Sequence, residues 1–277
     1  MSNFYRVGDT RLGFSEAGIG LPVVFLHPTP VDREFWTPLT QQLSRIRAIA
    51  PDLRGHGVSE LGHDLPVGAF TRVPDAPVLT MEQLAADTIA LLDHLRIDSA
   101  VFAGCSIGGY VILELWRRAP GRIRGLAFLC SKPQPDAETN LAKRAETIAR
   151  ARTEGVATLF DGMAQNLVGS ITRRDHPEVV VALRSRMTLT PDAFVAVQTG
   201  LAIRPDSVLT VATINVPVLA VAGGEDSGIS PAEMEAFRQA PGGCEYHAID
   251  DAGHFAANEQ PQRMADLMAP WLQQFSI

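Results

Sequence analysis

Short apolar runs alternate along this chain with longer stretches in which apolar residues recur every three or four positions. The short runs are rich in β-branched residues, and they predict strands at 23–26, 46–50, 100–104, 123–130, 217–222 and 245–249. Several runs are almost entirely apolar, which is typical of strands buried on both faces of a parallel sheet. Because strands that alternate with helices form βαβ units, the pattern predicts an α/β fold with a mostly parallel central sheet.

Capping residues mark where helices begin. Thr80 opens a capping-box sequence, which predicts a helix that runs to about residue 95. Ser230, followed by a proline and by Glu233 three residues on, marks a second start. Between 133 and 205 the sequence contains helical stretches and no convincing strand, so we predict a helical insertion there. Arginines are dense in this insertion, which is typical of a solvated helix surface.

Composition narrows the class of protein. The 277 residues are 46% hydrophobic and 20% charged, which excludes a disordered or collagen-like chain. The formal net charge of −7 and the aromatic content of 6% argue against a nucleic-acid partner, which needs a basic patch or stacking platforms. No apolar run approaches the roughly 18 residues of a membrane span, and the first residues contain no apolar segment of a secretory signal.

The cysteines indicate a reducing compartment. Their number is odd and they lie far apart, at Cys105, Cys130 and Cys244. Free buried thiols fit this spacing better than disulfides or a zinc site, and the histidines show no metal-ligand spacing either. Together with the missing signal and membrane span, this predicts a cytoplasmic protein without a metal site. The sequence leaves a homo-oligomer open.

The strongest chemical signal is a Gly-x-Ser-x-Gly motif at 104–108, with Ser106 at its centre. An apolar strand precedes the motif and a helical run follows it, which is the context that presents a nucleophilic serine. The tight turn forces Ser106 into a strained conformation, and a side chain at Gly104 or Gly108 would collide with a neighbouring element. The following helix directs backbone N–H groups at developing negative charge. We therefore predict Ser106 as the nucleophile.

A serine nucleophile needs a base that is oriented by a third group. His254 is the best base, because it follows the short strand at 245–249 and such folds place reactive groups at strand ends. Asp226 is the favoured acid, because its loop directly follows an apolar strand and the order Ser, Asp, His is then the expected one. Glu225 and Asp251 remain competing candidates for the acid.

With these motifs the chain resembles the α/β-hydrolase superfamily over nearly its whole length. Leu26-His27-Pro28-Thr29-Pro30 resembles the family's His-Gly-x-Pro oxyanion loop, and residues 52–59 match its Asp-x-Arg-Gly-His-Gly-x-Ser segment. The resemblance implies an α/β-hydrolase core formed by 1–132 and 206–277, with a helical cap inserted at 133–205. The members most similar in style are small esterases, enol-lactonases, aminopeptidase-like enzymes and cofactor-free haloperoxidases.

The resemblance also implies how the site is completed. It assigns the oxyanion donors to the backbone N–H groups of Thr29 and Ile107, with Pro28 standing where the family usually has glycine. It places the substrate pocket between the cap and the loops around Thr29, Trp36 and residues 60–80, with Thr29 and Trp36 as substrate-binding residues. No Gly-x-Gly-x-x-Gly motif opens the first βαβ unit and no P-loop is present in the sequence, so no cofactor is implied.

We therefore expect a serine hydrolase that cleaves a small carboxylic ester or lactone through an acyl-enzyme intermediate. Ser106 is the expected nucleophile, His254 the base and then the acid, and Asp226 the residue that orients it. Three alternatives on the same fold stay open: perhydrolysis with peroxide as the acceptor, a ligand-binding role with slow turnover, and a lyase or C–C bond hydrolase. The side chains around the predicted pocket do not identify a substrate.

Overall fold

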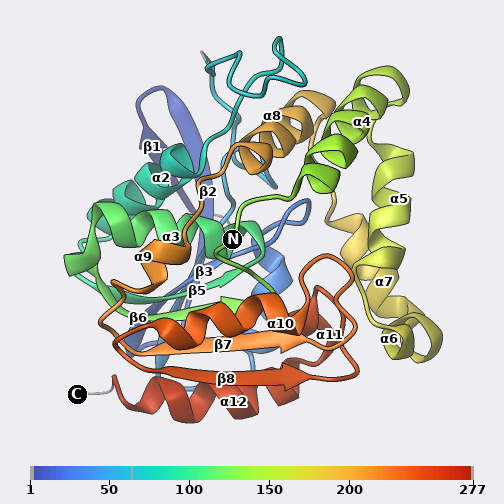
Figure 1. Ribbon diagram of the computed structural model, residues 1–277. Coiled ribbons are helices and arrows are strands. Elements are labelled where there is room, and N and C mark those ends of the chain that lie inside the picture. The colour runs from blue at the N-terminus through green and yellow to red at the C-terminus, as the bar shows by residue number, and fades with distance from the viewer. Residues whose placement is uncertain (1–2, 64, 276–277) are drawn as a thin grey trace.

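An eight-stranded sheet forms the centre of the molecule in this computed structural model, which describes residues 3–63 and 65–275 (Figure 1). The strands are β1 (Asn3–Val7), β2 (Thr10–Ala17), β3 (Leu21–Leu26), β4 (Ile46–Pro51), β5 (Ala100–Cys105), β6 (Ile123–Leu129), β7 (Val218–Gly223) and β8 (Cys244–Ile249). They follow the order β1-β2-β4-β3-β5-β6-β7-β8. β2 pairs antiparallel with β1 and β4, and all other neighbours are parallel. The predicted α/β fold with a mostly parallel sheet is confirmed.

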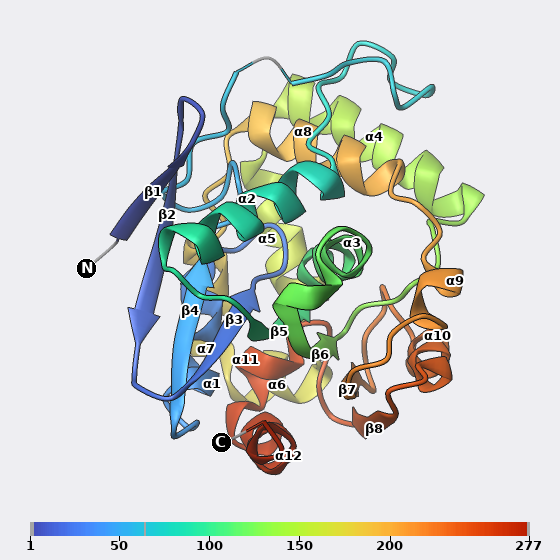
Figure 2. The same cartoon turned by 90° about the vertical axis from the view of Figure 1, so that its left-hand side faces the viewer.

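The described part of the chain contains helices on both faces of this sheet and beside its end. They are α1 (Thr37–Thr40), α2 (Met81–His94), α3 (Ile107–Arg118), α4 (Glu138–Glu154), α5 (Ala157–Asn166), α6 (Ser170–Asp175), α7 (Pro177–Ser185), α8 (Pro191–Ala202), α9 (Val208–Val211), α10 (Pro231–Met234), α11 (Ala256–Glu259) and α12 (Pro261–Gln273), with 3-10 turns η1 (Arg33–Trp36), η2 (Pro120–Arg122) and η3 (Glu235–Gln239). α2 and α3 pack together on one face, and α12 lies on the other (Figure 2). Within residues 3–63 and 65–275, no helix combines the length and apolar character needed to cross a bilayer.

Local sequence signals locate most of these elements. Each strand predicted from an apolar run is present, with its ends displaced by at most two residues. Thr80 caps α2 by accepting the N–H of Gln83, and Ser230 forms a complete capping box with Glu233 at α10. The β1–β2 hairpin was not predicted, because its residues mix polar with apolar types and only some of them are buried.

Helices α4 to α8, called the cap helices below, occupy the predicted insertion. Residues 133–205 contain no strand, and every residue of this segment is described. α4 packs against α8, and α5 packs against α7. Figure 1 shows the cap helices beside the end of the sheet toward which the arrowheads of β7 and β8 point. The carboxyl ends of the parallel strands therefore face the cap helices, and loops at this edge are where α/β sheets bind ligands.

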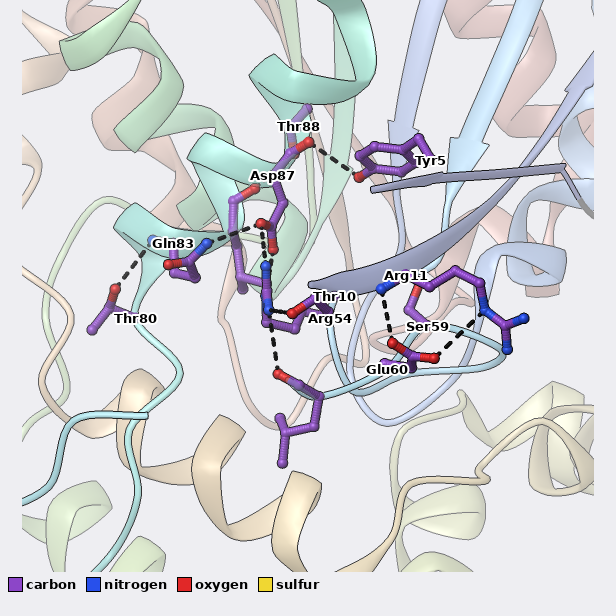
Figure 3. A network of polar contacts seen from close by, with 12 residues as sticks. Tyr5, Thr10, Arg11, Arg54, Ser59, Glu60, Thr80, Gln83, Asp87 and Thr88 are labelled. Carbon is purple, nitrogen blue, oxygen red and sulfur yellow. Dashed lines mark hydrogen bonds and ion pairs between the residues drawn. The ribbon is translucent and has the colours of Figure 1, made fainter. Parts of the chain in front are cut away.

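A buried ion pair anchors the loop after β4 to helix α2 (Figure 3). Arg54 Nε and Nη2 donate to the two carboxylate oxygens of Asp87 at 2.8 and 2.7 Å. The two side chains are 7% and 5% exposed. Arg54 Nη1 also donates to the Thr10 hydroxyl at 2.8 Å, and the Gln83 amide donates to Asp87 at 2.9 Å. A bidentate pair fixes orientation as well as position, so this network holds the loop formed by residues 52–59.

Candidate active site

Ser106 lies on the tight turn between β5 and α3. Its backbone adopts φ 52° and ψ −116°, a conformation that residues other than glycine rarely occupy. A Cβ at Gly104 would stand 2.4 Å from the carbonyl carbon of Gly108, and a Cβ at Gly108 would stand 2.1 Å from the carbonyl oxygen of Leu26. These two glycines therefore allow β3, β5 and α3 to approach one another closely around Ser106, as the motif predicts.

His254 and Asp226 form a buried pair where the loops after β7 and β8 meet. His254 Nδ1 donates to Asp226 Oδ2 at 2.7 Å. The other carboxylate oxygen, Oδ1, accepts the N–H groups of Gly228 and Ile229 at 2.8 and 3.0 Å. Because these bonds fix the carboxylate, they also fix the imidazole ring with its proton on Nδ1. Nε2 is then the ring nitrogen left to exchange a proton with a bound group.

The charge of each partner sets the pKa of the other. Burial alone would lower the pKa of His254, since the charged ring loses its water. The charge of Asp226 and the hydrogen bond to it outweigh burial, and they raise the pKa of His254 from 6.5 to about 9. Burial would likewise raise the pKa of Asp226, but the His254 charge and the hydrogen bonds to the carboxylate lower it. The pair therefore favours an imidazolium facing a carboxylate.

The two competing acids make other contacts. Glu225 is exposed, and its carboxylate accepts the N–H and the hydroxyl of Ser170 at 2.5 and 2.8 Å. Asp251 pairs with an arginine of α12 at 2.5 Å. Of the three candidate acids, Asp226 is the one that the structure brings to His254.

Ser106, His254 and Thr29 line a cavity of about 350 Å³ between the sheet and the cap helices. α5 and α8 supply apolar side chains to its wall, including Leu159 and Phe194. A volume of this order suits a small ligand. Within the described part of the chain, the Ser106 hydroxyl makes no hydrogen bond to the His254 ring, and catalytic contacts of this kind often tighten only when substrate binds. No group of three or more His, Cys, Asp or Glu among residues 3–63 and 65–275 is arranged to hold a metal ion.

Two buried histidines hold the loop that carries Thr29. His56 Nε2 accepts a hydrogen bond from the Thr29 hydroxyl at 3.0 Å. His27 Nδ1 donates to the Pro28 carbonyl at 2.9 Å, while its Nε2 accepts the Leu53 N–H at 2.9 Å. Burial lowers the pKa of His27 to about 4 and that of His56 to about 3. Both rings are therefore neutral, which their acceptor role at Nε2 requires.

The predicted substrate contact of Trp36 is wrong. Its indole is 1% exposed and packs against Phe25 and Phe35, with ring centroids 5.4 and 4.9 Å away. These aromatic neighbours bury the ring in the hydrophobic core, and Trp36 does not line the cavity. Residues 60–80, also expected at the pocket, contribute nothing to its wall in their described part.

Glu259 joins the histidine loop to the cap helices, and no sequence motif pointed to it. Its carboxylate accepts the Gly253 N–H at 2.9 Å, the Gly169 N–H at 2.6 Å and the Thr172 hydroxyl at 2.8 Å. Partial burial raises the pKa of Glu259, and these hydrogen bonds oppose that rise. The cap helices are thus tied directly to the residue that precedes His254.

Sequence reasoning also missed a polar face on α4. Arg144, interpreted as part of a solvated surface, lines the cavity together with Asn140, Lys143 and Thr147. Arg144 forms an ion pair with Asp136 and donates to a side-chain oxygen of α8 at 2.7 Å. A helical-wheel reading of α4 finds these residues on one face, but only the fold shows that this face borders the cavity.

A family model described as the alpha/beta hydrolase family matches residues 23–267, a range that includes Ser106, Asp226 and His254. The chain belongs to the α/β hydrolase family. The match spans most of the chain, so the resemblance inferred from separate motifs is confirmed for the whole fold.

A solved structure and two relatives are similar to this α/β hydrolase, each over a different share of the chain. The solved structure of a thermophilic esterase from Thermogutta terrifontis is 32% identical, with a TM-score of 0.88 and 100% of both chains covered. The 3-oxoadipate enol-lactonase 1 of Acinetobacter baylyi is 24% identical over 261 residues, which are 89% of this chain and 86% of that protein. A putative non-heme haloperoxidase of Mycobacterium phage D29 is 34% identical over 121 residues, and this match spans 43% of this chain and only 39% of that protein.

Proposed function

We propose that this α/β hydrolase cleaves a small carboxylic ester or lactone through an acyl-enzyme intermediate on Ser106. The observation that carries the proposal is the buried His254–Asp226 pair, bonded at 2.7 Å, on the cavity that Ser106 also lines. The similar esterase and enol-lactonase support this reaction class. A serine at position 106, rather than an aspartate, favours acyl transfer.

In the acylation step, Ser106 Oγ attacks the carbonyl carbon while its proton passes to Nε2 of neutral His254. The bond between the carbonyl carbon and the leaving oxygen then breaks, and His254 gives its proton to that oxygen. The product is an alcohol, or for a lactone a hydroxyl group that stays on the acyl chain. Asp226 holds the ring and stabilises the imidazolium that forms in between.

In the deacylation step, water takes the place of the alcohol. The water oxygen attacks the acyl carbon while His254 Nε2 accepts one proton from the water. The bond from that carbon to Ser106 Oγ breaks, and the proton passes from His254 to Oγ. The free acid leaves and the enzyme is restored.

The negative charge that develops on the carbonyl oxygen needs donors, for which we propose the backbone N–H groups of Thr29 and Ile107. Ile107 is the first residue of α3 and directly follows Ser106. Thr29 lines the cavity, and its hydroxyl already donates to His56, which favours a backbone role. A donor of this kind contributes about 3 kcal/mol in the transition state. We also propose Thr29 as a substrate contact.

We propose that the chain is divided into an α/β-hydrolase core, 1–132 and 206–277, and a cap, 133–205. The position of the cavity between the sheet and α4, α5 and α8 supports this division. Residues 1–2, 64 and 276–277 of the proposed core lie outside the described residues.

Hydrolysis of p-nitrophenyl acetate and butyrate by the wild-type protein and Ser106→Ala tests the proposal. We expect the wild type to release p-nitrophenol, and the variant to lose at least about 10³-fold in kcat. A thermal melt of each protein shows whether the variant keeps its fold. A folded Ser106→Ala protein that retains the wild-type rate would exclude the mechanism.

Peroxide is a second candidate acceptor, because one relative is described as a putative haloperoxidase. In that reaction hydrogen peroxide replaces water at the acyl-enzyme, and the product is a peracid that oxidises halide in solution. Peroxide-dependent bromination of monochlorodimedone in acetate buffer would detect it. Bromination that Ser106→Ala abolishes supports this acceptor, and the absence of bromination beside active ester hydrolysis excludes it.

A further inference from the structure

Both lysines of the chain lie at the active-site cavity. The sequence has 24 basic residues, and all of them except Lys132 and Lys143 are arginines. These two lysines line the same cavity as Ser106 and His254. An ammonium group is a compact charge on a flexible stem, whereas a guanidinium group suits a fixed bidentate partner. Both ammonium groups of the lysine side chains are therefore concentrated at this one cavity.

Lys143 belongs to a continuous polar face of α4. Asn140, Lys143, Arg144 and Thr147 all line the cavity. Their spacing of three, four and seven residues from Asn140 places them on one side of the helix. A helix that only covered the core would turn an apolar stripe inward. α4 packs such a stripe, which contains Ile148 and Ala151, against the core. It additionally presents charged and hydrogen-bonding groups to the cavity, which suits a polar part of a ligand.

The cavity carries positive charge although the chain as a whole has a formal net charge of −7. Arg144 and a second arginine, Arg204, share the single carboxylate of Asp136. Lys132 Nζ lies 2.5 Å from Glu233 Oε1. No residue that the structure describes forms an ion pair with Lys143. Of the three cationic side chains of lysine and arginine that line the cavity, Lys132 and Arg144 are paired with a carboxylate of the described residues and Lys143 is not, and Arg204 behind the wall adds a further positive charge at Asp136.

We propose that the natural substrate carries a carboxylate remote from the scissile carbonyl, and that Lys143 binds this carboxylate. This rests on the ester or lactone hydrolysis proposed above and names its substrate class. The apolar wall that contains Leu159, Met163 and Phe194 then faces the hydrocarbon chain between the two ends of the substrate. Asn140 and Thr147 supply uncharged hydrogen-bonding groups on either side of Lys143.

Lys143 is exposed at the edge of the cavity, which limits the strength of the interaction. An ion pair that stays in contact with water is weakened by its hydration and by salt. We therefore expect a change in substrate preference of about tenfold, equivalent to about 1.4 kcal/mol. This preference should fall as the salt concentration rises.

Matched pairs of esters test the proposal. Monomethyl esters of linear dicarboxylic acids, from succinate to suberate, are compared with methyl esters of monocarboxylic acids of the same length, and acid release is followed in a pH-stat. The preference is the ratio of kcat/KM for the half-ester to kcat/KM for the neutral ester. In the wild type it should exceed one for at least one chain length. Lys143→Gln should lower this ratio about tenfold, and Lys143→Arg, which keeps the charge, should lower it less.

Arg150→Gln is the matched control. Arg150 lies on the same helix and pairs with Glu154 at 3.4 Å, away from the cavity lining. The substitution Arg150→Gln removes one positive charge outside the cavity, so the ratio of kcat/KM for the half-ester to that for the neutral ester should stay within about twofold of the wild type. An equal loss in Arg150→Gln and Lys143→Gln, or a ratio of one or less at every chain length, would overturn the proposal. If no ester of either series is hydrolysed, the proposed function itself fails.

A labelling experiment tests the carboxylate site without turnover. Lys132 and Lys143 are the only side-chain amines, and because Lys132 is buried beside Glu233 while Lys143 is exposed, peptide mapping reads the two lysines separately. In Ser106→Ala, monomethyl adipate should slow the reductive methylation of Lys143, as read by peptide mass spectrometry, and methyl hexanoate should not. Methylation of Lys143 at the same rate with and without the half-ester would contradict the proposal.

Discussion

Replacing Asp226 by asparagine tests how the histidine is held. Asp226 Oδ1 accepts the N–H groups of Gly228 and Ile229 at 2.8 and 3.0 Å, and both bonds require an oxygen at that position. In Asp226→Asn the amide oxygen therefore keeps this position, and the NH₂ group faces His254 Nδ1. Two donors cannot bond to each other, so the ring must carry its proton on Nε2. In that tautomer it cannot accept the proton of Ser106.

The loss of activity has an electrostatic part and a tautomer part. Burial lowers the pKa of His254, but the charge of Asp226 and the hydrogen bond to it outweigh burial and raise this pKa from 6.5 to about 9. Since one tenfold change in a proton equilibrium is about 1.4 kcal/mol, the pair favours the imidazolium by about 3 kcal/mol. Losing this stabilisation costs about 10²-fold in rate. The wrong tautomer adds to it, so we expect kcat/KM to fall about 10³- to 10⁴-fold.

The assay is kcat/KM for p-nitrophenyl butyrate as a function of pH. In the wild type the base must first lose a proton with a pKa of about 9, so kcat/KM should rise as the pH approaches that value. In Asp226→Asn burial remains while the raising charge is absent, so any rise should move to lower pH.

Glu225→Gln is the control for this prediction. It makes the same carboxylate-to-amide change at the neighbouring residue, whose side chain bonds to Ser170 and not to His254. We expect kcat/KM of this variant to stay within about tenfold of the wild type. The reasoning is refuted if Asp226→Asn loses less than Glu225→Gln, or if its pH profile matches that of the wild type.

Three further predictions concern stability and positioning. Asp87→Ala leaves the buried Arg54 charge unpaired, so urea denaturation should show a free energy of unfolding lower by about 3–5 kcal/mol; no measurable change would contradict the burial of the pair. His27 and His56 have folded pKa values of about 4 and 3 against 6.5 when exposed. The contribution of these two neutral histidines to the free energy of unfolding is therefore complete above pH 6.5 and is lost as the pH falls. Between pH 6 and pH 5 the free energy of unfolding should fall by about 2 kcal/mol, and urea denaturation curves that coincide at these two pH values would exclude this effect. Glu259→Gln has one acceptor oxygen for three donors, so kcat should fall about tenfold with KM little changed, whereas a shift in melting temperature alone would mean that the residue does not position His254.

The fold, and the meeting of His254 with Asp226 at the cavity that Ser106 lines, could be expected from the sequence because their signals are local. An apolar run, a capping pair or a glycine at a tight turn acts through residues close to it in sequence. The Gly-x-Ser-x-Gly motif therefore indicated Ser106, and the loops that follow two predicted strands indicated Asp226 and His254. The choice of Asp226 over Glu225 rested on its loop, and the 2.7 Å contact with His254 agrees with it.

Features that depend on packing between distant segments were not predictable. Trp36 was expected at the pocket because the resembled family binds substrate near this loop, but the direction of a large side chain depends on neighbours such as Phe25 in another element. Glu259 binds groups from the cap helices nearly ninety residues away, and nothing near it in sequence indicates them. The polar face of α4, which contains Lys143, looks like an ordinary solvated surface until the fold places it on the cavity.

The most direct test of the central claim is covalent trapping of the nucleophile. Diethyl p-nitrophenyl phosphate transfers a phosphoryl group to an activated serine hydroxyl, and the phosphorylated enzyme does not turn over readily. The account predicts one diethylphosphoryl group per chain, mapped by peptide mass spectrometry to Ser106, with ester hydrolysis lost in step with labelling. Labelling of another residue, or active ester hydrolysis in a protein that takes up no label at Ser106, would contradict it.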